Sequence, residues 1–370
     1  MNKTSAVQTI GILTSGGDAP GMNAAIRAVV RTALNKGLKV KGIQKGYNGL
    51  LNDEIIDMDK RSVADIIQRG GTVLYTARCM EFMTEEGQKR GAEVCRKHGI
   101  DGIVVIGGDG SFRGAQKLAA QGINTIGLPG TIDLDIACTD YTIGFDTAVN
   151  TAMEAIDKIR DTSTSHERCS IIEVMGRNAG WLTAASALAR IEGRKVPQLI
   201  YLCEKAFDED RFIEDVNEAL KKENNIIIAV SEGVKTADGN YVGEETKSGK
   251  EDVFGHKYLS GVGKYLEGLV GEKIGCKVRS VELNILQRCA GYMLSETDIM
   301  ESRNLGAFAA VSAIRGKSGK MSAVRRISDD PYQVEIVLSD LSKIANYEKK
   351  VPMEWINEEG NDIKDELLTY

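Results

Sequence analysis

The alternation of short apolar runs with glycine-rich turns and helical stretches is the feature that most limits how this 370-residue chain can fold. Buried strands are predicted at 9–14, 38–43, 102–106 and 125–128, and helices begin after the glycine-rich turns that follow the first and the third of them. Strands that are joined through helices run parallel, so we expect an α/β fold with a parallel sheet and helices on both faces.

The same rhythm restarts after Gly144 and predicts a second α/β unit. Its predicted helices are 147–160, 179–189 and 209–222, and its predicted strands are 170–175, 198–202, 225–230 and 278–286. A further helix is predicted at 298–315. We expect one domain from 1–144 plus 287–337 and another from 145–286 plus 338–370. The polar segment 235–253 is expected to be a surface insertion or hairpin.

Composition excludes several classes of function. A net charge of −6 and 5% aromatic residues argue against binding to nucleic acid or to an acidic membrane surface. No run of 18 apolar residues predicts a membrane span, and no apolar signal segment precedes the first strand. The seven cysteines are scattered without a CxxC pair and the three histidines lack ligand spacing, so reduced thiols are favoured over disulfides or zinc. We expect a cytoplasmic protein.

The glycine-rich turn at 14–23 lies between a predicted strand and a predicted helix. Its glycines let backbone N–H groups approach a phosphate, and the helix N-terminus adds a favourable dipole. The turn matches neither the P-loop nor the dinucleotide fingerprint. A turn that needs glycine only for packing is the alternative interpretation.

The turn at 107–111 also follows a predicted strand, and it carries one carboxylate. Asp109 stands between Gly108 and Gly110 there. This pattern suits Mg²⁺ bound to a polyphosphate, because magnesium often takes one or two protein carboxylates and fills its other positions with phosphate oxygens and water. A helix N-cap is the alternative role for this aspartate.

The turn at 129–135 carries two carboxylates, Asp133 and Asp135. They project to the same side if the segment is extended. One of them could accept a proton from an attacking hydroxyl, and the other could lie near metal or phosphate. A solvated acidic loop is the alternative.

Five arginines lie at the ends of predicted elements near glycine-rich turns, where guanidinium groups can bind phosphate with two hydrogen bonds. They are Arg78, Arg168, Arg177, Arg279 and Arg288. Such a cluster would supply locally the positive charge that an acidic chain needs to bind a phosphate ester. For any single arginine, a solvated surface position is the alternative.

Five motifs occur in the order and spacing of the phosphofructokinases: TSGGDAPGMNAAIR, GGDGS, PGTID-x-D, DYTIGFDTA and EVMGRNAGW. The chain resembles that family from Thr9 to about Arg288, with a looser C-terminal part. The resemblance implies the phosphofructokinase fold, with two Rossmann-like three-layer αβα domains and mostly parallel sheets. It implies that Mg-ATP phosphorylates the 1-hydroxyl of fructose 6-phosphate in glycolysis, with Mg²⁺ as cofactor.

The resemblance also implies residue roles. Catalysis would involve Asp133 as the general base, together with Arg177, Thr131 and Gly17. The nucleotide would bind at Gly17, Tyr47, Arg78, Cys79, Gly108, Asp109, Gly110 and Ser111, with Asp109 as metal ligand. Fructose 6-phosphate would bind at Thr131, Asp133, Asp135, Arg168, Met175, Gly176, Arg177, Glu232, Arg279 and Arg288. The first domain would hold Mg-ATP and the second the sugar phosphate. Arg168 and Arg279 would come from a neighbouring subunit, so the resemblance implies a homo-oligomer, a tetramer or a dimer.

Two glycines bear on the phosphoryl donor. Pyrophosphate-using relatives carry Asp after the magnesium aspartate and Lys before the catalytic threonine, and these side chains would occupy the space of the ATP α-phosphate. Gly110 and Gly130 stand at these positions here, so ATP is the predicted donor. The insertion after Glu232 and the long C-terminal tail resemble pyrophosphate-dependent relatives, and they keep pyrophosphate as the alternative donor.

Two substitutions depart from the family pattern. Leu134 replaces an asparagine of the catalytic loop, and Ile285 stands where a histidine usually contacts the sugar phosphate. The change at Ile285 allows a different acceptor, such as a larger ketose phosphate. Together, Leu134 and Ile285 motivate a second alternative, a non-catalytic regulatory subunit that senses sugar phosphates.

Overall fold

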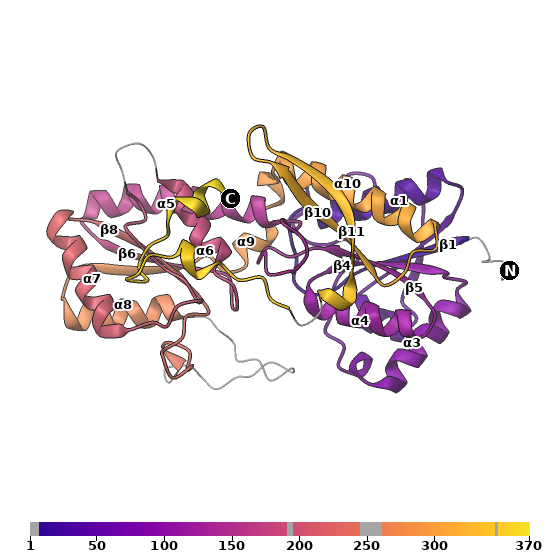
Figure 1. The fold of residues 1–370 in the computed structure, drawn as a ribbon, viewed down its shortest axis with the longest axis horizontal. Helices are drawn as coiled ribbons and strands as arrows, with labels where there is room; N and C mark the ends of the chain where they lie inside the picture. The colour runs from indigo at the N-terminus through magenta and orange to yellow at the C-terminus, as the bar shows by residue number, and fades with distance from the viewer. Residues whose placement is uncertain (1–6, 191–194, 245–260, 345–346) are drawn as a thin grey trace. The chain divides into compact units, whose positions relative to one another are not determined.

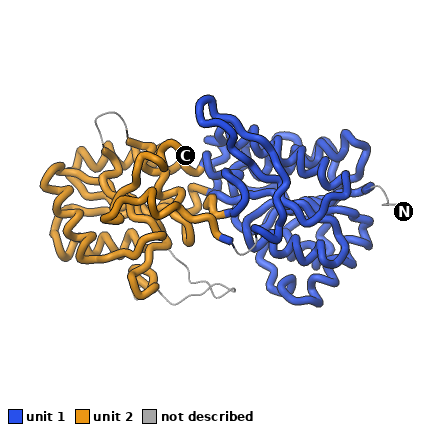
Figure 2. The backbone as a smooth tube through the Cα atoms, in the orientation of Figure 1, with its two compact units in different colours: residues 1–132, 136–147, 288–347 blue, residues 133–135, 148–287, 348–370 orange. Residues whose placement is uncertain are grey.

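The computed structural model describes residues 7–190, 195–244, 261–344 and 347–370. The chain divides into two compact units (Figure 2). Unit 1 comprises 1–132, 136–147 and 288–347, and unit 2 comprises 133–135, 148–287 and 348–370. Each unit has its own mostly parallel sheet and its own apolar core (Figure 1), so the predicted α/β class is confirmed. Within the described residues, no helix has the length and apolar character needed to cross a membrane.

Unit 1 contains a seven-stranded sheet in the order β11-β10-β5-β4-β1-β2-β3. The edge strands β3 and β11 are antiparallel to their neighbours, and the other pairs are parallel. The strands are β1 (Thr9–Thr14), β2 (Lys39–Ile43), β3 (Ile55–Met58), β4 (Gly102–Gly107), β5 (Asn124–Pro129), β10 (Lys320–Ser328) and β11 (Gln333–Asp340). Every residue of β1 and β4 is buried, as expected for central strands that are covered on both faces.

Helices cover both faces of this sheet (Figure 1). α1 (Met22–Asn35) and α10 (Glu296–Ile314) pack together on one face, and α3 (Glu85–Lys97) and α4 (Asp109–Ala120) lie on the other, next to the short α2 (Gly46–Leu51). The close approach of α1 and α10 needs Gly306, because a Cβ there would lie 2.8 Å from Ala25 O. On the other face, Phe112 fills the space over Gly127, where a Cβ would lie 2.7 Å from its ring.

Unit 2 contains a four-stranded, fully parallel sheet in the order β7-β8-β6-β9. The strands are β6 (Cys169–Val174), β7 (Leu199–Tyr201), β8 (Ile226–Ser231) and β9 (Val278–Glu282). The helices are α5 (Phe145–His166), α6 (Trp181–Ala185), α7 (Glu209–Lys222) and α8 (Val262–Lys273), with the short α9 (Leu286–Cys289) and α11 (Asp365–Thr369). α8 packs on β6 and β9, and α6 packs on β7 and β8, so the central strands are again covered.

Several helices begin where side chains replace missing backbone partners. Thr84, Asp208 and Ser295 are the N-caps of α3, α7 and α10, and each side chain accepts the N–H three residues further along. Such caps are typically worth about 1 kcal/mol each. They explain why these helices begin at sharply defined positions.

Some elements differ from the predictions. The strand predicted at 278–286 ends at Glu282, because Asn284 adopts a positive φ of 41° and the chain then enters α9. The helix predicted at 179–189 begins only at Trp181 and continues as a 3₁₀ turn over Ser186–Ala189. Strands β3, β10 and β11 were not predicted.

The predicted division of the chain also differs from the observed units. The prediction put 338–370 in the second domain, whereas 338–347 lie with unit 1, because β11 continues to Asp340 as the partner of β10. The polar segment predicted to begin at 235 forms an antiparallel bridge between Lys235 and Tyr241. The remainder of that prediction, 245–253, lies outside the described residues.

α10 carries two buried carboxyl groups. Asp298 accepts hydrogen bonds from the N–H groups of Gly144 (2.7 Å) and Thr147 (2.8 Å) and from the Thr147 hydroxyl (2.6 Å), which fixes the chain at the start of α5. Burial raises the pKa of Asp298 to about 6. One turn later, Glu301 accepts a hydrogen bond from the Tyr332 hydroxyl, and burial raises the pKa of Glu301 to about 7.

Glu301 predicts a pH-dependent stability. Its pKa in the folded protein, about 7, lies above its ordinary value of 4.5, so between these values the folded protein holds a proton that the unfolded chain has released. This group's contribution to stability is therefore full below about pH 4.5 and is lost as the pH rises to about 7. Glu301→Gln mimics the protonated form at every pH. Between pH 5 and pH 8, the free energy of unfolding of this variant should therefore rise by roughly 1–3 kcal/mol relative to that of wild type.

Thermal unfolding at the two pH values measures this difference. Glu296→Gln is the control, because Glu296 is an exposed glutamate in the first turn of the same helix. The control should shift the Tm equally at both pH values. If the difference in Tm between Glu301→Gln and wild type did not change with pH, it would contradict a protonated, buried Glu301.

Candidate active site

The loop between β1 and α1 presents exposed backbone at its tip. Its base is fixed, because the Ser15 N–H donates to Ile106 O at the end of β4 (2.9 Å). Gly16 (φ +91°) and Gly21 (φ +95°) adopt left-handed conformations that glycine reaches without strain. Gly16 and Gly17 are exposed, and α1 begins directly after Gly21. This loop can therefore offer N–H groups to an anion.

Two polar residues of the same motif hold a neighbouring segment rather than a ligand. Asp18 accepts a hydrogen bond from the Thr72 N–H (2.9 Å). Asn23 donates to Gly71 O (2.9 Å) and accepts from the Val73 N–H (3.0 Å). The segment that leads to the predicted donor-site residues 78 and 79 is thereby tied to the glycine-rich loop.

Tyr47, predicted to lie at the donor site, supports that site from the core. Its side chain is buried, its hydroxyl donates to Ser111 O (2.6 Å), and its ring stacks on Phe82 with a centroid separation of 4.3 Å. Cys79 packs against the same core, and burial raises the pKa of its thiol. Arg78 is exposed. Direct contact of these residues with a nucleotide stays a prediction.

Asp109 is the first residue of α4. The N-cap of this helix is Gly108, so the alternative role of Asp109 as an N-cap is wrong. Its Oδ2 lies 2.9 Å from Nη2 of Arg113, one turn along the helix. In the part of the chain that the structure describes, no three His, Cys, Asp or Glu side chains gather to hold a metal. A single carboxylate here fits Mg²⁺ that arrives with a polyphosphate.

The two glycines predicted to select the donor have different surroundings. A Cβ at Gly110 would meet no atom of the described residues within 4 Å. A Cβ at Gly130 would lie 2.8 Å from Ile106 Cγ2 and 3.1 Å from Met22 Cε. Close packing therefore explains why glycine stands at 130, but it does not explain the glycine at 110. Of the two, Gly110 is the clearer indicator of the donor.

The segment that carries Asp133 passes from unit 1 into unit 2. Thr131 is buried, and its carbonyl accepts a hydrogen bond from the Thr142 hydroxyl (2.7 Å). Leu134 has a φ of 55°, so the segment is not extended. Asp133 and Asp135 were expected to project to the same side only in an extended segment, so this expectation does not apply.

The left-handed backbone at Leu134 also explains the family preference at this position. This conformation costs most residues roughly 1–2 kcal/mol, and asparagine tolerates it better. The Leu134 side chain is fully buried, so apolar burial offsets the cost here.

The carboxyl ends of β6 and β8 hold the Met175–Arg177 segment. The Met175 N–H donates to Oε1 of the fully buried Gln287 (2.9 Å). The Gly176 N–H donates to Glu232 (3.3 Å), and its carbonyl accepts from the Ser231 hydroxyl (2.8 Å). The backbone that precedes Arg177 is thus held on both sides.

The pKa of Glu232 is shifted by burial and by the charged side chains near this edge of the sheet. Burial, together with repulsion from Asp133, raises this pKa to about 7, and the Arg177 charge acts in the opposite direction. Asp133 and Arg177 are therefore each within electrostatic reach of Glu232. A Cβ at Gly233 would lie 1.8 Å from Arg177 O, so only glycine allows this close approach. Unit 2 brings together the predicted residues Asp133, Met175, Gly176, Arg177 and Glu232.

Arg168 and Arg279 lie at the opposite edge of the same sheet. Arg168 directly precedes β6, and Arg279 pairs with Ser170 near the amino end of β9. Arg177, in contrast, follows the carboxyl end of β6. The six strand residues between the two edges span about 20 Å. Unit 2 therefore does not bring Arg168 and Arg279 to its own Arg177.

Arg288 and Ile285 lie close together in the sequence but have different surroundings. Arg288, predicted to bind the sugar phosphate, lies in unit 1 beside the glycine-rich loop, with Nη1 donating to Asp18 O (3.5 Å). A Cβ at Gly17 would lie 2.8 Å from that nitrogen. Ile285 is 66% exposed, so an apolar side chain faces solvent where the family usually has a histidine.

Sequence reasoning missed the residues that hold these loops in place. Asp18 and Asn23 lie inside the first motif, and Gln287 immediately precedes Arg288. Nothing local distinguishes a carboxylate or an amide that binds backbone from one that binds a ligand. Their partners lie 46 or more residues away, so only the tertiary structure identifies them.

Comparison with known sequences covers most of the chain. The family model described as "Phosphofructokinase" matches residues 9–314. An ATP-dependent 6-phosphofructokinase of Clostridium botulinum is 51% identical over 283 residues, which is 75% of this chain and 86% of the relative. An ATP-dependent 6-phosphofructokinase of Clostridium novyi is 46% identical over 352 residues, which is 92% of this chain and 100% of the relative.

Solved structures agree with the sequence relatives. The pyrophosphate-dependent phosphofructokinase from Marinobacter aquaeolei has a TM-score of 0.86 and 27% identity, covering 98% of this chain and 90% of that one. The phosphofructokinase from Saccharomyces cerevisiae has a TM-score of 0.72 and 29% identity, covering 91% of this chain and 45% of that one. The predicted resemblance is confirmed, and the chain belongs to the phosphofructokinase family.

Proposed function

We propose that this chain is an ATP-dependent 6-phosphofructokinase, which transfers the γ-phosphoryl group of Mg-ATP to the 1-hydroxyl of fructose 6-phosphate in glycolysis. Relatives of that name are 51% and 46% identical over most of their lengths. The observation that carries the proposal is the gathering of Asp133, Arg177 and Glu232 in unit 2. A base, a cation and a hydroxyl-binding carboxylate are the groups that this transfer needs.

Unit 1 is the proposed donor site. The exposed backbone at Gly16 and Gly17 and the N-terminus of α1 would bind phosphate oxygens. Asp109 would hold Mg²⁺, which when bound offsets negative charge on the donor phosphates. Arg288 lies beside Gly17 and adds a second positive charge to the same loop. Arg78 would add a further one.

Asp133 is the proposed general base. Its carboxylate takes the proton of the 1-hydroxyl as that oxygen attacks the γ-phosphorus, and the bond from this phosphorus to the β–γ bridging oxygen breaks, so ADP leaves. Arg177 offsets the negative charge on the transferred group. Glu232 and the backbone of Met175 and Gly176 would orient the sugar, because their positions are fixed by the contacts with Gln287 and Ser231.

Pyrophosphate is the alternative donor, and one observation favours it. The solved pyrophosphate-dependent relative matches nearly the full length of this chain, including the C-terminal region. Gly110 argues against pyrophosphate as the donor. A side chain there would extend into open space, which the resemblance to the family assigns to the α-phosphate of ATP. A non-catalytic sugar-phosphate sensor is the remaining alternative, and it predicts binding without turnover.

We also propose a homo-oligomer with shared sites, and the position of two arginines supports it. Along the sheet, Arg168 lies about 20 Å from Arg177, and Arg279, which pairs with Ser170, lies about 13 Å from the carboxyl end of β6. If these two arginines bind a sugar phosphate, we expect it to be one held by another subunit. This supports the proposal that the sugar-phosphate site is completed by a neighbouring chain. A cytoplasmic location stays a prediction.

Removal of the base tests the reaction. Asp133→Asn should lower kcat by about 10²- to 10⁴-fold, because the 1-hydroxyl then loses its proton acceptor, while fructose 6-phosphate still binds. A coupled assay for fructose 1,6-bisphosphate measures the rate, and calorimetry measures sugar-phosphate binding.

Asp210→Asn is the matched control for this substitution. Asp210 is an exposed aspartate in the first turn of α7, within the same unit. The control should keep wild-type kcat. A near wild-type kcat for Asp133→Asn would refute the role of Asp133 as the base.

Substitution at Gly110 tests the donor. Gly110→Asp should fold normally, because no described atom lies within 4 Å of the new Cβ. It should weaken the use of ATP by at least about tenfold, since its charge and bulk occupy the α-phosphate position. Gly110→Ala adds a methyl group without charge and should have a smaller effect. Assays with Mg-ATP and Mg-pyrophosphate in parallel measure both variants, and a wild type that prefers pyrophosphate would overturn the ATP assignment.

Mixing two defective chains tests the shared site. One parent carries Asp133→Asn and the other carries Arg168→Ala with Arg279→Ala, and each alone should be nearly inactive. In a dimer with shared sites, random pairing should restore about a quarter of wild-type activity, because mixed dimers contain one intact site. Absence of any recovery in co-expressed, co-purified chains would contradict a site built from two subunits.

A further inference from the structure

Residues 348–370, here called the strap, fold back onto unit 2. The backbone of Lys349 joins two loops of the proposed active site. Its N–H donates to Asp135 O (2.8 Å), and its carbonyl accepts a hydrogen bond from Nε1–H of the buried Trp181 (2.8 Å). Asp135 lies two residues after Asp133, and Trp181 lies four residues after Arg177. One residue of the strap therefore ties the base loop to the arginine loop.

Two further contacts reinforce the connection to the arginine loop. Asn178 Nδ2 donates to Glu348 Oε1 (2.7 Å). Glu204 Oε1 accepts from the N–H of Gly180 (2.8 Å) and from the N–H of Val351 (3.0 Å). The loop from Asn178 to Trp181 is thus fastened to the strap by three separate polar contacts.

An aromatic cluster holds the near part of the strap. The Trp181 ring lies 5.2 Å from the Tyr370 ring and 6.1 Å from the Trp355 ring, centroid to centroid. Lys349 Nζ lies 5.2 Å from the Trp181 centroid and 5.0 Å from the Tyr370 centroid, and it donates to the Tyr370 hydroxyl. Cation–π contacts of this kind favour one position of the lysine.

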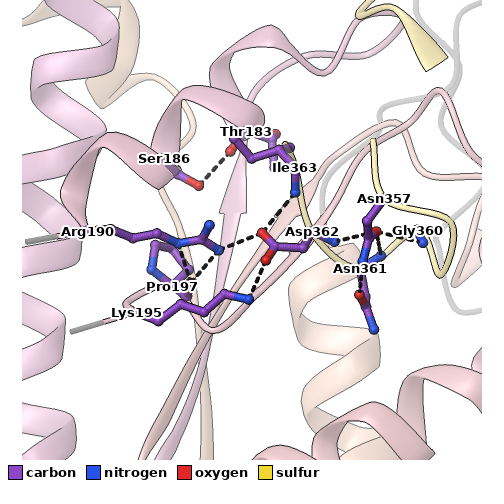
Figure 3. Close-up of polar contacts among 10 residues, drawn as sticks. All are labelled: Thr183, Ser186, Arg190, Lys195, Pro197, Asn357, Gly360, Asn361, Asp362 and Ile363. Carbon is purple, nitrogen blue, oxygen red and sulfur yellow. Dashed lines mark hydrogen bonds and ion pairs between the residues drawn. The ribbon is translucent and has the colours of Figure 1, made fainter. Parts of the chain in front are cut away.

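Polar contacts anchor the far part of the strap (Figure 3). Asp362 forms ion pairs with Arg190 (2.7 Å) and with Lys195. Asn357 Oδ1 accepts the N–H groups of residues 360, 361 and 362, which forms a tight turn. The Ile200 N–H donates to the carbonyl of residue 361 (2.8 Å), so the strap adds to the edge of β7. Both parts of the strap are therefore fixed to the rigid core of unit 2.

We propose that the strap is a positioning element for phosphoryl transfer, and that Trp181 is the positioning residue through which it fixes the base loop relative to the arginine loop. This inference rests on the proposed function. Leu134 gives the base loop a left-handed conformation that persists only while surrounding contacts hold it, and burial of the Leu134 side chain is one of these contacts. The Lys349 N–H supplies such a contact at Asp135.

Trp181→Phe tests the connection, because it removes the N–H donor to Lys349 O and keeps an aromatic ring. We expect kcat to fall about 10-fold and the KM for fructose 6-phosphate to change less than about threefold, since the loop geometry and not the sugar site is loosened. Hydrogen exchange of the backbone at 133–136 should be faster than in wild type. Trp355→Phe is the control from the same cluster, and it should leave kcat within about twofold.

A second pair of variants tests the backbone contact. Lys349→Pro removes both the N–H that Asp135 accepts and the side chain, whereas Lys349→Ala removes only the side chain. The proline variant should lower kcat at least about fivefold more than the alanine variant. Circular dichroism and sugar-phosphate binding show that each variant is folded.

The outcomes separate this inference from the proposed function. A wild type that is inactive with both donors refutes the proposed function. An active wild type together with a folded Trp181→Phe variant of unchanged kcat refutes the inference and leaves the function intact. Unchanged hydrogen exchange at 133–136 in Trp181→Phe refutes the inference whatever the activity.

Discussion

The parallel pairing of β4 with β1 and β5 is the constraint on which the donor half of the site depends. The register pairs Ile10 with Gly102 and Ile103 with Thr125, so the three strands end at one edge of the sheet. Beyond the strands, Ser15 N–H to Ile106 O and Gly130 N–H to Gly107 O continue the pairing into the loops. The three glycine-rich turns therefore begin side by side at the edge of the sheet where ligands of open α/β sheets commonly bind.

The candidate residues of the second unit lie at two edges of one sheet. Its carboxyl edge holds Met175–Arg177 and Glu232 through contacts with buried side chains, and its amino edge presents Arg168 and Arg279. A parallel sheet separates these edges by the length of a strand, so one chain cannot use both sets for one small ligand. The strap adds a different kind of constraint, since it fixes loops after the strands have ended.

The donor is separable from the fold in this protein. A solved pyrophosphate-dependent relative has a TM-score of 0.86 with this chain, while sequence relatives named as ATP-dependent are about half identical to it. Both can be true of one architecture, because Gly110 stands in open space and a side chain there would need no repacking of the core. Gly130 is less informative, since Ile106 and Met22 already exclude a side chain there.

Local sequence determined the elements whose signals are local. The strand at 9–14 and the helix at 209–222 have their predicted bounds, because a short run centred on Ile and Leu and an amphipathic run with an Asp cap need no distant partner. Strand β10 and the edge strand β11 escaped prediction. No residue of β11 is fully buried, and its apolar residues are interspersed with polar ones, so it lacks the continuous apolar run of a central strand. In the same way, the motifs identified the family and the glycine-rich loops, but not the contacts of Asp18, Gln287 or Lys349. Those contacts join residues that are 50 or more positions apart, so only the tertiary structure could decide which polar groups hold the loops and which are left to bind substrates.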